Sequence, residues 1–270
     1  MKMRSDNSPV VLTIAGTDPS GGAGINVDLQ VFRDHGVHGV AAITAVVWQN
    51  TQEIRGWRPV KPGELRAQME AVADDFELSA VKIGMVPTAE LVGEVARFVS
   101  GVDSGVDVVI DPVMVGGRGE QELTTAEGRG AMSALRERVD LLTPNTPEAR
   151  ELLGSSSSMS PEETVQALQS SGWSRVLLKG GHCRRDDELA VDWYGGDSAV
   201  EALEGLAPVG EDVRGTGCQL SSAIAARRAH GDGWREAISK ARRYLNGLLH
   251  NKARRLGKGR PIVVRTGETR

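Results

Sequence analysis

The sequence predicts an α/β protein whose mostly parallel central sheet is covered by helices on both faces. Short apolar runs typical of buried strands alternate with amphipathic stretches of helical period, and short loops join them. The chain has 33 glycines and only ten aromatic residues, which suits a sheet with many tight turns. With 270 residues, 40% of them hydrophobic, we expect one domain over 1–270 rather than two small ones. Within it, 1–8 are expected as a flexible N-terminus and 259–270 as a C-terminal tail.

The expected elements follow in order along the chain. Buried strands are predicted at 10–15, 40–47, 80–83, 106–110, 141–143 and 176–179. Helices are predicted at 25–36, 64–72, 89–99, 127–136, 147–153, from 161 onward, after 218 and at 234–255. Ser160 and Glu163 form a capping-box pattern, with Pro161 at the first helical position. The segments 188–194 and 199–206 alternate with period two and predict a small antiparallel edge, while the polar segment 52–60 predicts an irregular flap.

Composition narrows the classes of protein. Two cysteines, Cys183 and Cys218, provide no disulfide framework, so we expect a cytoplasmic protein. No apolar run has the length of a membrane span, and we expect no membrane association. Residues 240–270 carry ten Lys and Arg against one acid, but no aromatic residues are spaced for base stacking. A solvated helix face and a tail are therefore expected here in preference to nucleic-acid binding.

The polar residues that follow the predicted strands should gather at one edge of the sheet. Parallel strands end at the same edge, and ligands of such sheets bind there. The strands run into Gly16–Asp18, Gln49–Thr51, Gly84–Met85, Asp111–Val113, Pro144–Asn145 and Gly180–His182. This edge is the predicted site.

The segment Gly215–Thr216–Gly217–Cys218 opens a helix at the same edge. A glycine-rich turn at a helix start directs unpaired N–H groups and the positive end of the helix dipole to one point, which suits an anion. We expect the helix N-terminus to lower the pKa of the Cys218 thiol. The alternative is a glycine-containing helix start with a buried small thiol.

Five further residues complete the predicted chemistry. Lys179 ends an apolar strand and suits charge neutralisation beside a phosphate. Asp111, Asn145 and Glu148 carry oxygens that can hold Mg²⁺ through its waters, although helix capping is an equal alternative for Asn145 and Glu148. His182 is an acid/base candidate, with support of a loop as the alternative. No P-loop, protein-kinase or dinucleotide-binding motif is present, so the residues indicate an enzyme for an anionic or phosphorylated ligand, with phosphoryl transfer as one reaction class.

Seven ordered motifs resemble the hydroxymethylpyrimidine/phosphomethylpyrimidine kinases of thiamine biosynthesis, within the ribokinase-like superfamily. They span nearly the whole chain, at Ala15–Ile25, Gln49–Thr51, Lys82–Met85, Asp111–Met114, Thr143–Ala149, Lys179–His182 and Gly215–Ala226. The resemblance implies a ribokinase-like three-layer α/β/α fold and a cytoplasmic homodimer. It implies ATP- and Mg²⁺-dependent phosphorylation of 4-amino-5-hydroxymethyl-2-methylpyrimidine and then of its monophosphate.

The resemblance also assigns roles to single residues. Gly215, Thr216, Gly217 and Cys218 match the family's anion hole, with Cys218 at the position of the base of related sugar kinases. Lys179 matches the lysine near the ATP phosphates, and Asn145, Glu148 and Asp111 match the metal site. Gln49 matches the glutamine that hydrogen-bonds the pyrimidine, and Asp18, Met85 and Val113 match other residues of that pocket.

Several positions depart from the family pattern. They are Asn26–Val27, Val47–Trp48, the loop at 116–119, and Arg214, which stands where histidine is common. These departures bear on the substrate and leave the fold and phosphoryl transfer unaffected. The alternatives are a pyridoxal kinase and a non-catalytic pyrimidine or nucleotide sensor, although a sensor has no need for the transfer groups at Lys179, Asn145, Glu148 and Cys218.

Overall fold

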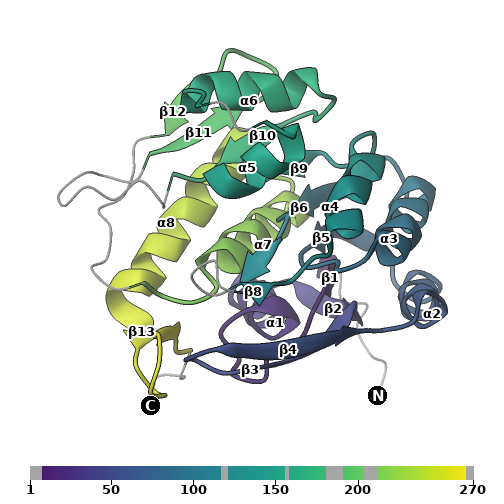
Figure 1. Cartoon of the computed structure of the whole chain (residues 1–270), viewed down its shortest axis with the longest axis vertical. Coiled ribbons are helices and arrows are strands. Elements are labelled where there is room, and N and C mark those ends of the chain that lie inside the picture. Colours follow the sequence, from purple (N-terminus) through teal and green to yellow (C-terminus); the bar gives the residue numbers. More distant parts are fainter. Residues whose placement is uncertain (1–7, 117–120, 156–157, 181–190, 204–211, 266–270) are drawn as a thin grey trace.

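The computed structural model describes residues 8–116, 121–155, 158–180, 191–203 and 212–265, and an eight-stranded sheet forms its centre (Figure 1). The strand order is β12-β11-β10-β9-β6-β5-β1-β2. The parallel strands are β1 (Val10–Ala15), β2 (His38–Ile43), β5 (Leu78–Ile83), β6 (Asp107–Ile110), β9 (Leu141–Leu142) and β10 (Val176–Leu178). Strands β11 (Asp192–Gly195) and β12 (Glu201–Leu203) add the antiparallel edge. The predicted sheet and its antiparallel edge are confirmed, and 188–190 and 204–206 lie outside the described residues.

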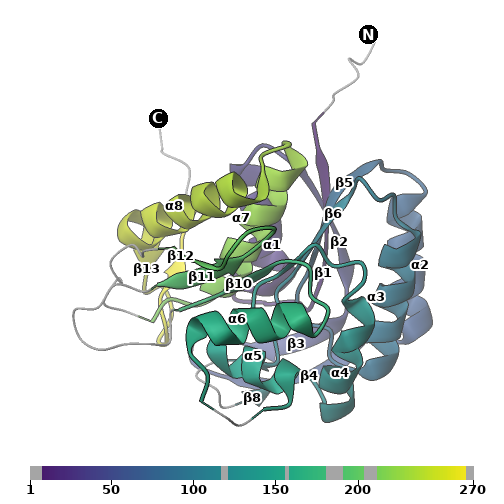
Figure 2. The same ribbon diagram turned by 90° about the horizontal axis from the view of Figure 1, so that it is seen from above.

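Helices cover both faces of this sheet and make three layers (Figure 2). One face carries α2 (Pro62–Ala73), α3 (Ala89–Gly101), α4 (Ala126–Ala131), the 3₁₀ helix η1 (Met132–Leu135), α5 (Thr146–Leu153) and α6 (Pro161–Ser170). The other face carries α1 (Gly24–Asp34), α7 (Thr216–Ala229) and α8 (Trp234–Lys252). Each face has its own apolar core, and strand residues such as Val11 and Leu12 point into opposite cores. The α/β/α architecture is therefore confirmed.

Local sequence signals explain where helices begin at the site edge. The α5 helix starts with a capping box, in which the Asn145 side chain accepts from the Glu148 N–H and the Glu148 carboxylate accepts from the Asn145 N–H, each at 2.8 Å. It ends at Gly154, whose φ of +59° is left-handed. The predicted capping box of α6 at Ser160 and Glu163 is confirmed. The Asn145 cap fixes the point at which the chain turns from β9 into α5, and the Ser160 cap fixes the start of α6.

The prediction of one strand over 40–47 is wrong. Strand β2 ends at Ile43, and β3 (Ala45–Gln49) leaves the central sheet to pair with β4 (Ile54–Pro59) in a separate antiparallel hairpin. Thr44 marks the break: its hydroxyl donates to the Met85 carbonyl at 2.6 Å, and its N–H donates to the Ala15 carbonyl. The predicted irregular flap at 52–60 is therefore mostly a strand, and the hairpin extends beside the carboxyl edge of the sheet (Figure 1).

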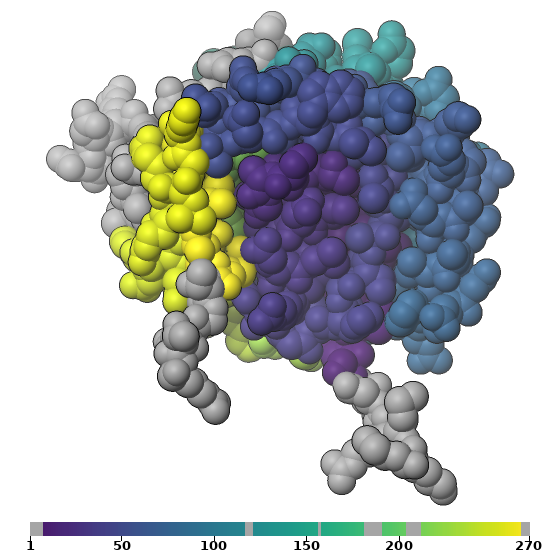
Figure 3. Space-filling view, turned by 90° about the horizontal axis from the view of Figure 1, so that it is seen from below, coloured from purple at the N-terminus to yellow at the C-terminus, as the bar shows by residue number. Residues whose placement is uncertain are grey.

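The C-terminal segment packs against the rest of the chain over its described part. Strand β13 (Ala253–Arg254) pairs with β14 (Ile262–Val263), and β7 (Val115–Gly116) pairs with β8 (Gln121–Glu122) elsewhere in the chain. Arg265 donates to Asp34 at 2.6 Å, and Figure 3 shows the yellow C-terminal segment beside the purple N-terminal region. Residues 259–265, expected as part of a tail, thus contain a short strand. Among the described helices, none is both long enough and apolar enough to cross a bilayer.

Candidate active site

The predicted site residues lie on loops that leave the carboxyl ends of the strands. Asp18 follows β1, Met85 follows β5, Asp111 and Val113 follow β6, Asn145 and Glu148 follow β9, and Lys179 follows β10. Gly215 caps α7, and Thr216, Gly217 and Cys218 form its first turn. Gln49 differs, because it ends β3 of the hairpin and not a strand of the central sheet. The chain passes from β2 on one side of β1 to β5 on the other, so the site lies at a topological switch point, where ligands of such sheets bind.

Lys179 is the charged centre of one half of the site. Its Nζ lies 2.6 Å from Asp111 Oδ1 and 3.8 Å from Glu148 Oε2. The backbones of Lys179 and Asn145 pair across an isolated parallel bridge, which brings Lys179 to the start of α5. Burial lowers the pKa of Lys179, but the carboxylates of Asp111 and Glu148 outweigh this effect and raise it. Lys179 is therefore a permanent cation at this edge.

The first turn of α7 lies beside Lys179. A Cβ added to Gly217 would lie 3.2 Å from Lys179 Nζ and 3.2 Å from Asp111 Oδ2. Gly215 has a φ of +72°, and a Cβ there would lie 1.9 Å from the Gly22 carbonyl oxygen. Glycine is therefore required at 215 both by conformation and by space. Within the described chain, the N–H groups of Thr216, Gly217 and Cys218 have no acceptor. The structure thus brings a cation and three free backbone donors to one place.

The pKa of the Cys218 thiol is shifted in the direction opposite to the one expected from the sequence. Burial raises the pKa of the Cys218 thiol to about 11; Lys82 and the Gly24 amide oppose the rise, while Asp111 and Asp28 add to it. The predicted lowering of the Cys218 pKa is therefore wrong, because burial outweighs the opposing effects of Lys82 and the Gly24 amide.

Glu148 is perturbed in the same direction. Burial raises the pKa of Glu148 to about 7, Lys179 opposes this, and Asp111 adds to it. When a further cation binds near a carboxyl group whose pKa is raised in this way, it lowers that pKa and favours the ionised carboxylate.

Asn145 and Glu148 do form the helix cap that was the alternative to a metal site. Within the described ranges, no group of three or more His, Cys, Asp or Glu side chains is placed to hold a metal. However, Asp111 and Glu148 both face Lys179, and each has a carboxylate oxygen that takes no part in the bonds to Lys179 Nζ or the Asn145 amide. Mg²⁺ is usually held by one or two carboxylates, its own waters and substrate phosphates, so this arrangement fits it.

The other half of the site is an apolar cluster with polar side chains near it. Met85 packs with Ala45, Val47, Leu123 and the partly buried Val113 in a small separate cluster. Asp18 is fully buried and accepts from the Ser20 N–H and hydroxyl at 2.9 and 2.7 Å and from the Gly22 N–H at 3.2 Å. Gln49 donates to the Thr17 carbonyl at 3.2 Å. All four residues predicted for substrate binding therefore border this region.

Sequence reasoning missed two groups at the site. Arg214 bonds both Asp18 and Gln49, across separations of 196 and 165 residues that no local pattern reveals. Lys82 forms a fully buried ion pair with Asp28 at 2.8 Å, and Thr13 and Ser222 also donate to that carboxylate at 2.7 Å. A lysine inside an apolar strand was the available signal for the second group. His182 lies outside the described residues.

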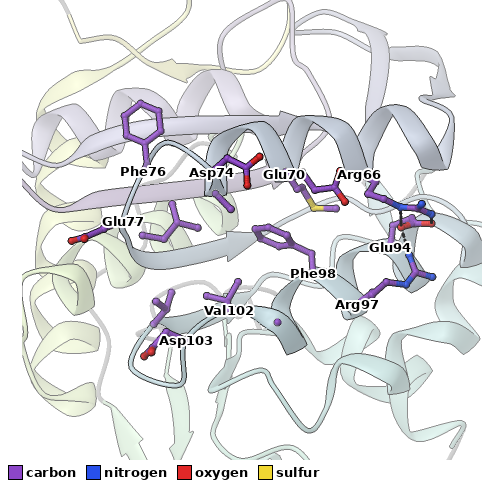
Figure 4. Close-up of a pocket in the computed structure, with 15 residues that line it drawn as sticks. Arg66, Glu70, Asp74, Phe76, Glu77, Glu94, Arg97, Phe98, Val102 and Asp103 are labelled. Carbon is purple, nitrogen blue, oxygen red and sulfur yellow. Dashed lines mark hydrogen bonds and ion pairs between the residues drawn. The ribbon is translucent and has the colours of Figure 1, made fainter.

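A groove elsewhere contains none of the predicted site residues. It lies between α2 and α3, and Leu78 and Val106 place it near the amino ends of β5 and β6, at the opposite edge of the sheet. Figure 4 shows Arg66 and Arg97 directed at Glu94 at one end of this groove. Its lining otherwise combines apolar and acidic side chains.

Comparisons with known proteins identify the family of the chain. A family model described as phosphomethylpyrimidine kinase matches residues 18–263. The chain is 35% identical over 241 residues to the hydroxymethylpyrimidine/phosphomethylpyrimidine kinase of Escherichia coli (88% of this chain, 90% of that protein). It is 34% identical over 243 residues to the enzyme of the same name from Bacillus subtilis (89% of each chain).

Solved structures extend the likeness to the fold. A phosphomethylpyrimidine kinase from Clostridium difficile has a TM-score of 0.74 and 32% identity, covering 89% of this chain and 99% of that one. The pyridoxal kinase of Staphylococcus aureus, in complex with AMP-PCP and pyridoxal, has a TM-score of 0.84 but only 25% identity, covering 96% and 94%. The expected ribokinase-like fold is thereby confirmed. The chain is more similar in sequence to the phosphomethylpyrimidine kinases, at 32% to 35% identity, than to this pyridoxal kinase, at 25%. The chain belongs to the phosphomethylpyrimidine kinase family.

Proposed function

We propose that the protein transfers the γ-phosphoryl group of ATP to 4-amino-5-hydroxymethyl-2-methylpyrimidine, and a second one to the resulting monophosphate, in thiamine biosynthesis. The observation that carries this proposal is the position of Lys179 beside Gly217 in the first turn of α7, where the N–H groups of Thr216, Gly217 and Cys218 find no acceptor among the described residues. A cation and backbone donors that converge at the carboxyl edge of a sheet are suited to a phosphoryl group in transfer. The relatives from Escherichia coli and Bacillus subtilis carry the name hydroxymethylpyrimidine/phosphomethylpyrimidine kinase.

In this proposal, some groups of the chain position the reactants and others offset negative charge. Phosphoryl transfer needs reactants in line and negative charge offset, more than it needs covalent chemistry. The N–H groups of the α7 start would hold oxygens of the moving phosphoryl group, and Lys179 would offset their charge. Met85 and Val113 would exclude water around the ring, and Gln49 would supply polar contacts to it. The fully buried Asp18 would hold Arg214 beside Gln49.

The proposed Mg²⁺ site uses Glu148, Asp111 and Asn145 around the metal's waters. The positive charge of Lys179 already faces the carboxylates of Asp111 and Glu148. Lys179 alone therefore cannot offset the negative charge of a nucleoside triphosphate. Mg²⁺, when bound, supplies the remaining positive charge to the phosphate oxygens. The raised pKa of Glu148 supports this role, because a nearby cation would favour its ionised form.

Cys218 is proposed as the group that receives the proton of the substrate's hydroxymethyl group. Because its pKa is about 11 without ligands, the thiol is protonated at neutral pH, and base action requires that pKa to fall when substrates bind. Lys82 already acts in that direction. A loose transition state makes only a modest demand on a base, so the gain expected from Cys218 is smaller than that from Lys179.

We also propose that the chain acts as one domain, in the cytoplasm, and as a homodimer. The central sheet combines strands from residues 10 to 203 with helices that follow them, which supports one folding unit. Val46 and Trp48 lie on β3 with 48% and 47% of their surfaces exposed, and a second subunit would cover such side chains. Light scattering after size-exclusion chromatography measures the subunit number directly.

An ATP-consumption assay tests the proposed reaction. Purified protein with Mg²⁺ is given the hydroxymethylpyrimidine, its monophosphate or pyridoxal, and kcat/KM is compared. We expect turnover of both pyrimidines and weaker turnover of pyridoxal. A clear preference for pyridoxal would instead support the activity named for the structural neighbour from Staphylococcus aureus. If the protein turned over none of the three compounds, the sensor alternative would be favoured.

A further inference from the structure

Arg214 joins three parts of the site through one side chain. Only 4% of its surface is exposed, and it directly precedes Gly215. Its Nη2 donates to Gln49 Oε1 at 2.6 Å and to Asp18 Oδ2 at 3.2 Å. The loop after β1, the end of β3 and the start of α7 therefore meet at one guanidinium group.

The backbone around Arg214 is held from the opposite side by the C-terminal segment. The Arg214 N–H donates to the Pro261 carbonyl at 2.9 Å. Arg260 donates to Asp212 at 2.6 Å, and its own N–H donates to the Thr51 carbonyl at 2.8 Å. Thr51 follows Gln49 in the hairpin, so the same segment restrains both ends of the Arg214–Gln49 contact. A side chain anchored in this way can impose an orientation on its partner.

The contacts of Gln49 leave only one orientation for its amide group. Arginine has donors and no acceptor, so the atom that faces Nη2 must be the amide oxygen. The Thr17 carbonyl at the other end can only accept, so the atom facing it must be Nε2, at 3.2 Å. Reversing the amide would place donor against donor and acceptor against acceptor. After both bonds form, Oε1 retains one lone pair and Nε2 retains one N–H.

A lone pair and an N–H side by side match a particular edge of a heteroaromatic ring. A 4-aminopyrimidine places an amine donor next to a ring-nitrogen acceptor, and both can pair with an amide held in this orientation. Pyridoxal has a methyl group and a hydrogen beside its ring nitrogen, so its ring nitrogen has no neighbouring amine. A site built to pair with a donor and an acceptor discriminates against a ring that leaves one of them unpaired.

We propose that Arg214 is a specificity-determining residue, which selects the aminopyrimidine by fixing the amide of Gln49. It acts through Gln49 and is a positioning residue. This inference rests on the proposed function, because it concerns which ring enters the same pocket. The alternative role for Arg214 is neutralisation of Asp18 alone, and the two roles differ in what happens to KM and to substrate choice.

Arg214→Met removes the donors and keeps most of the side-chain volume. Asp18 retains its bonds from the Ser20 N–H and hydroxyl and from the Gly22 N–H, which stabilise its carboxylate without the arginine. We expect KM for the hydroxymethylpyrimidine to rise about 10- to 100-fold. The kcat should stay within about threefold of the wild-type value, because the transfer groups at Lys179 and α7 are unchanged. The ratio of kcat/KM for the pyrimidine to that for pyridoxal should fall about tenfold or more.

A double-mutant cycle with Gln49→Ala identifies the route of the effect. If Arg214 acts through Gln49, Arg214→Met should change KM less than about threefold in the Gln49→Ala background. Losses that multiply in the double variant would overturn the inference, as would an unchanged KM and substrate ratio in a folded Arg214→Met protein. Circular dichroism and thermal melting establish that each variant is folded.

A second variant covers the case in which Arg214→Met does not fold. Arg214→Lys keeps the charge opposite Asp18, but its side chain is one bond shorter and lacks the planar fork. It should keep the fold and still raise KM for the pyrimidine at least about fivefold; wild-type KM and selectivity in this variant would show that only charge matters and would overturn the inference. Wild-type protein that does not turn over the pyrimidine would overturn the proposed function itself, and this inference with it.

Discussion

The protonation of Cys218 tests whether burial really outweighs the helix N-terminus at this site. A pKa of about 11 lies above the ordinary value of 9.0, so the thiolate fraction at pH 8 falls from about one tenth to about one thousandth. Only the thiolate reacts with alkylating reagents, so the thiol should be about 100-fold less reactive at this pH than an unshifted one. Restricted access also slows alkylation, and therefore the dependence on pH is more diagnostic than the absolute rate.

The assay uses the Cys183→Ser variant, in which Cys218 is the remaining cysteine. Alkylation by iodoacetamide is followed by mass spectrometry from pH 7 to 10.5, with the urea-unfolded variant as control. The native rate should rise about tenfold per pH unit without levelling off, whereas the unfolded rate should level off near pH 9. A native plateau below pH 9 would refute the argument that burial dominates.

The same shift has a defined sign in the pH dependence of stability. Because the folded chain binds the thiol proton more tightly than the unfolded chain, the shift stabilises the folded state at low pH. That contribution is fully present below pH 9 and is lost as the pH rises from 9 towards 11.

Further substitutions test separate parts of the site. Cys218→Ala should slow phosphorylation of the hydroxymethylpyrimidine about 10- to 100-fold and that of its monophosphate less, because a phosphate oxygen is already an anion; equal losses in the two steps, measured separately, would contradict a role as base. Gly215→Ala should lower the free energy of unfolding by at least about 2 kcal/mol, because φ is +72° and the Cβ would lie 1.9 Å from the Gly22 carbonyl oxygen. The control is Gly247→Ala in α8, where nothing surrounds the added Cβ and urea unfolding should show a gain of up to about 1 kcal/mol. Lys179→Met should reduce kcat at saturating ATP at least about 100-fold, and a residual kcat above a tenth of wild type would exclude the proposed role.

The sequence predicted the order of strands and helices because each signal was local. Ser160 with Glu163, and Gly154 after an amphipathic stretch, mark helix ends whatever the rest of the fold does. The break at Thr44 was not predictable in this way. An apolar run has the same pattern whether all of it stays in one sheet or part of it enters another. The break becomes visible only in the structure, where Thr44 contacts Met85 and β3 pairs with β4.

In the candidate site too, features that depend on local sequence were predicted, and features that depend on contacts between distant residues were not. The pattern of strand ends predicted that Lys179, Asp111 and Gly217 lie at one edge. In the structure Lys179 Nζ lies 2.6 Å from Asp111 Oδ1, and a Cβ added to Gly217 would lie 3.2 Å from both side chains. The pKa of Cys218 was predicted with the wrong sign, because a helix N-terminus can be recognised in sequence but the degree of burial cannot. Arg214 was visible only as a departure from the family pattern, and its effect depends on partners far away in the chain.

The start of α7, which is the proposed anion site, has its conformation fixed by contacts within the chain, and this is how one small loop would contribute to catalysis. Gly215 lies against the Gly22 carbonyl, and the backbone N–H of the preceding residue, Arg214, donates to the Pro261 carbonyl. Folding has therefore already met the entropic cost of directing the N–H groups that follow. Donors fixed in this way need not reorganise when charge develops on the phosphoryl group, and fixed donors stabilise such charge more than mobile ones. The backbone contact between Pro261 and Arg214 thus helps to fix the start of α7, although the C-terminal segment contributes none of the predicted catalytic side chains.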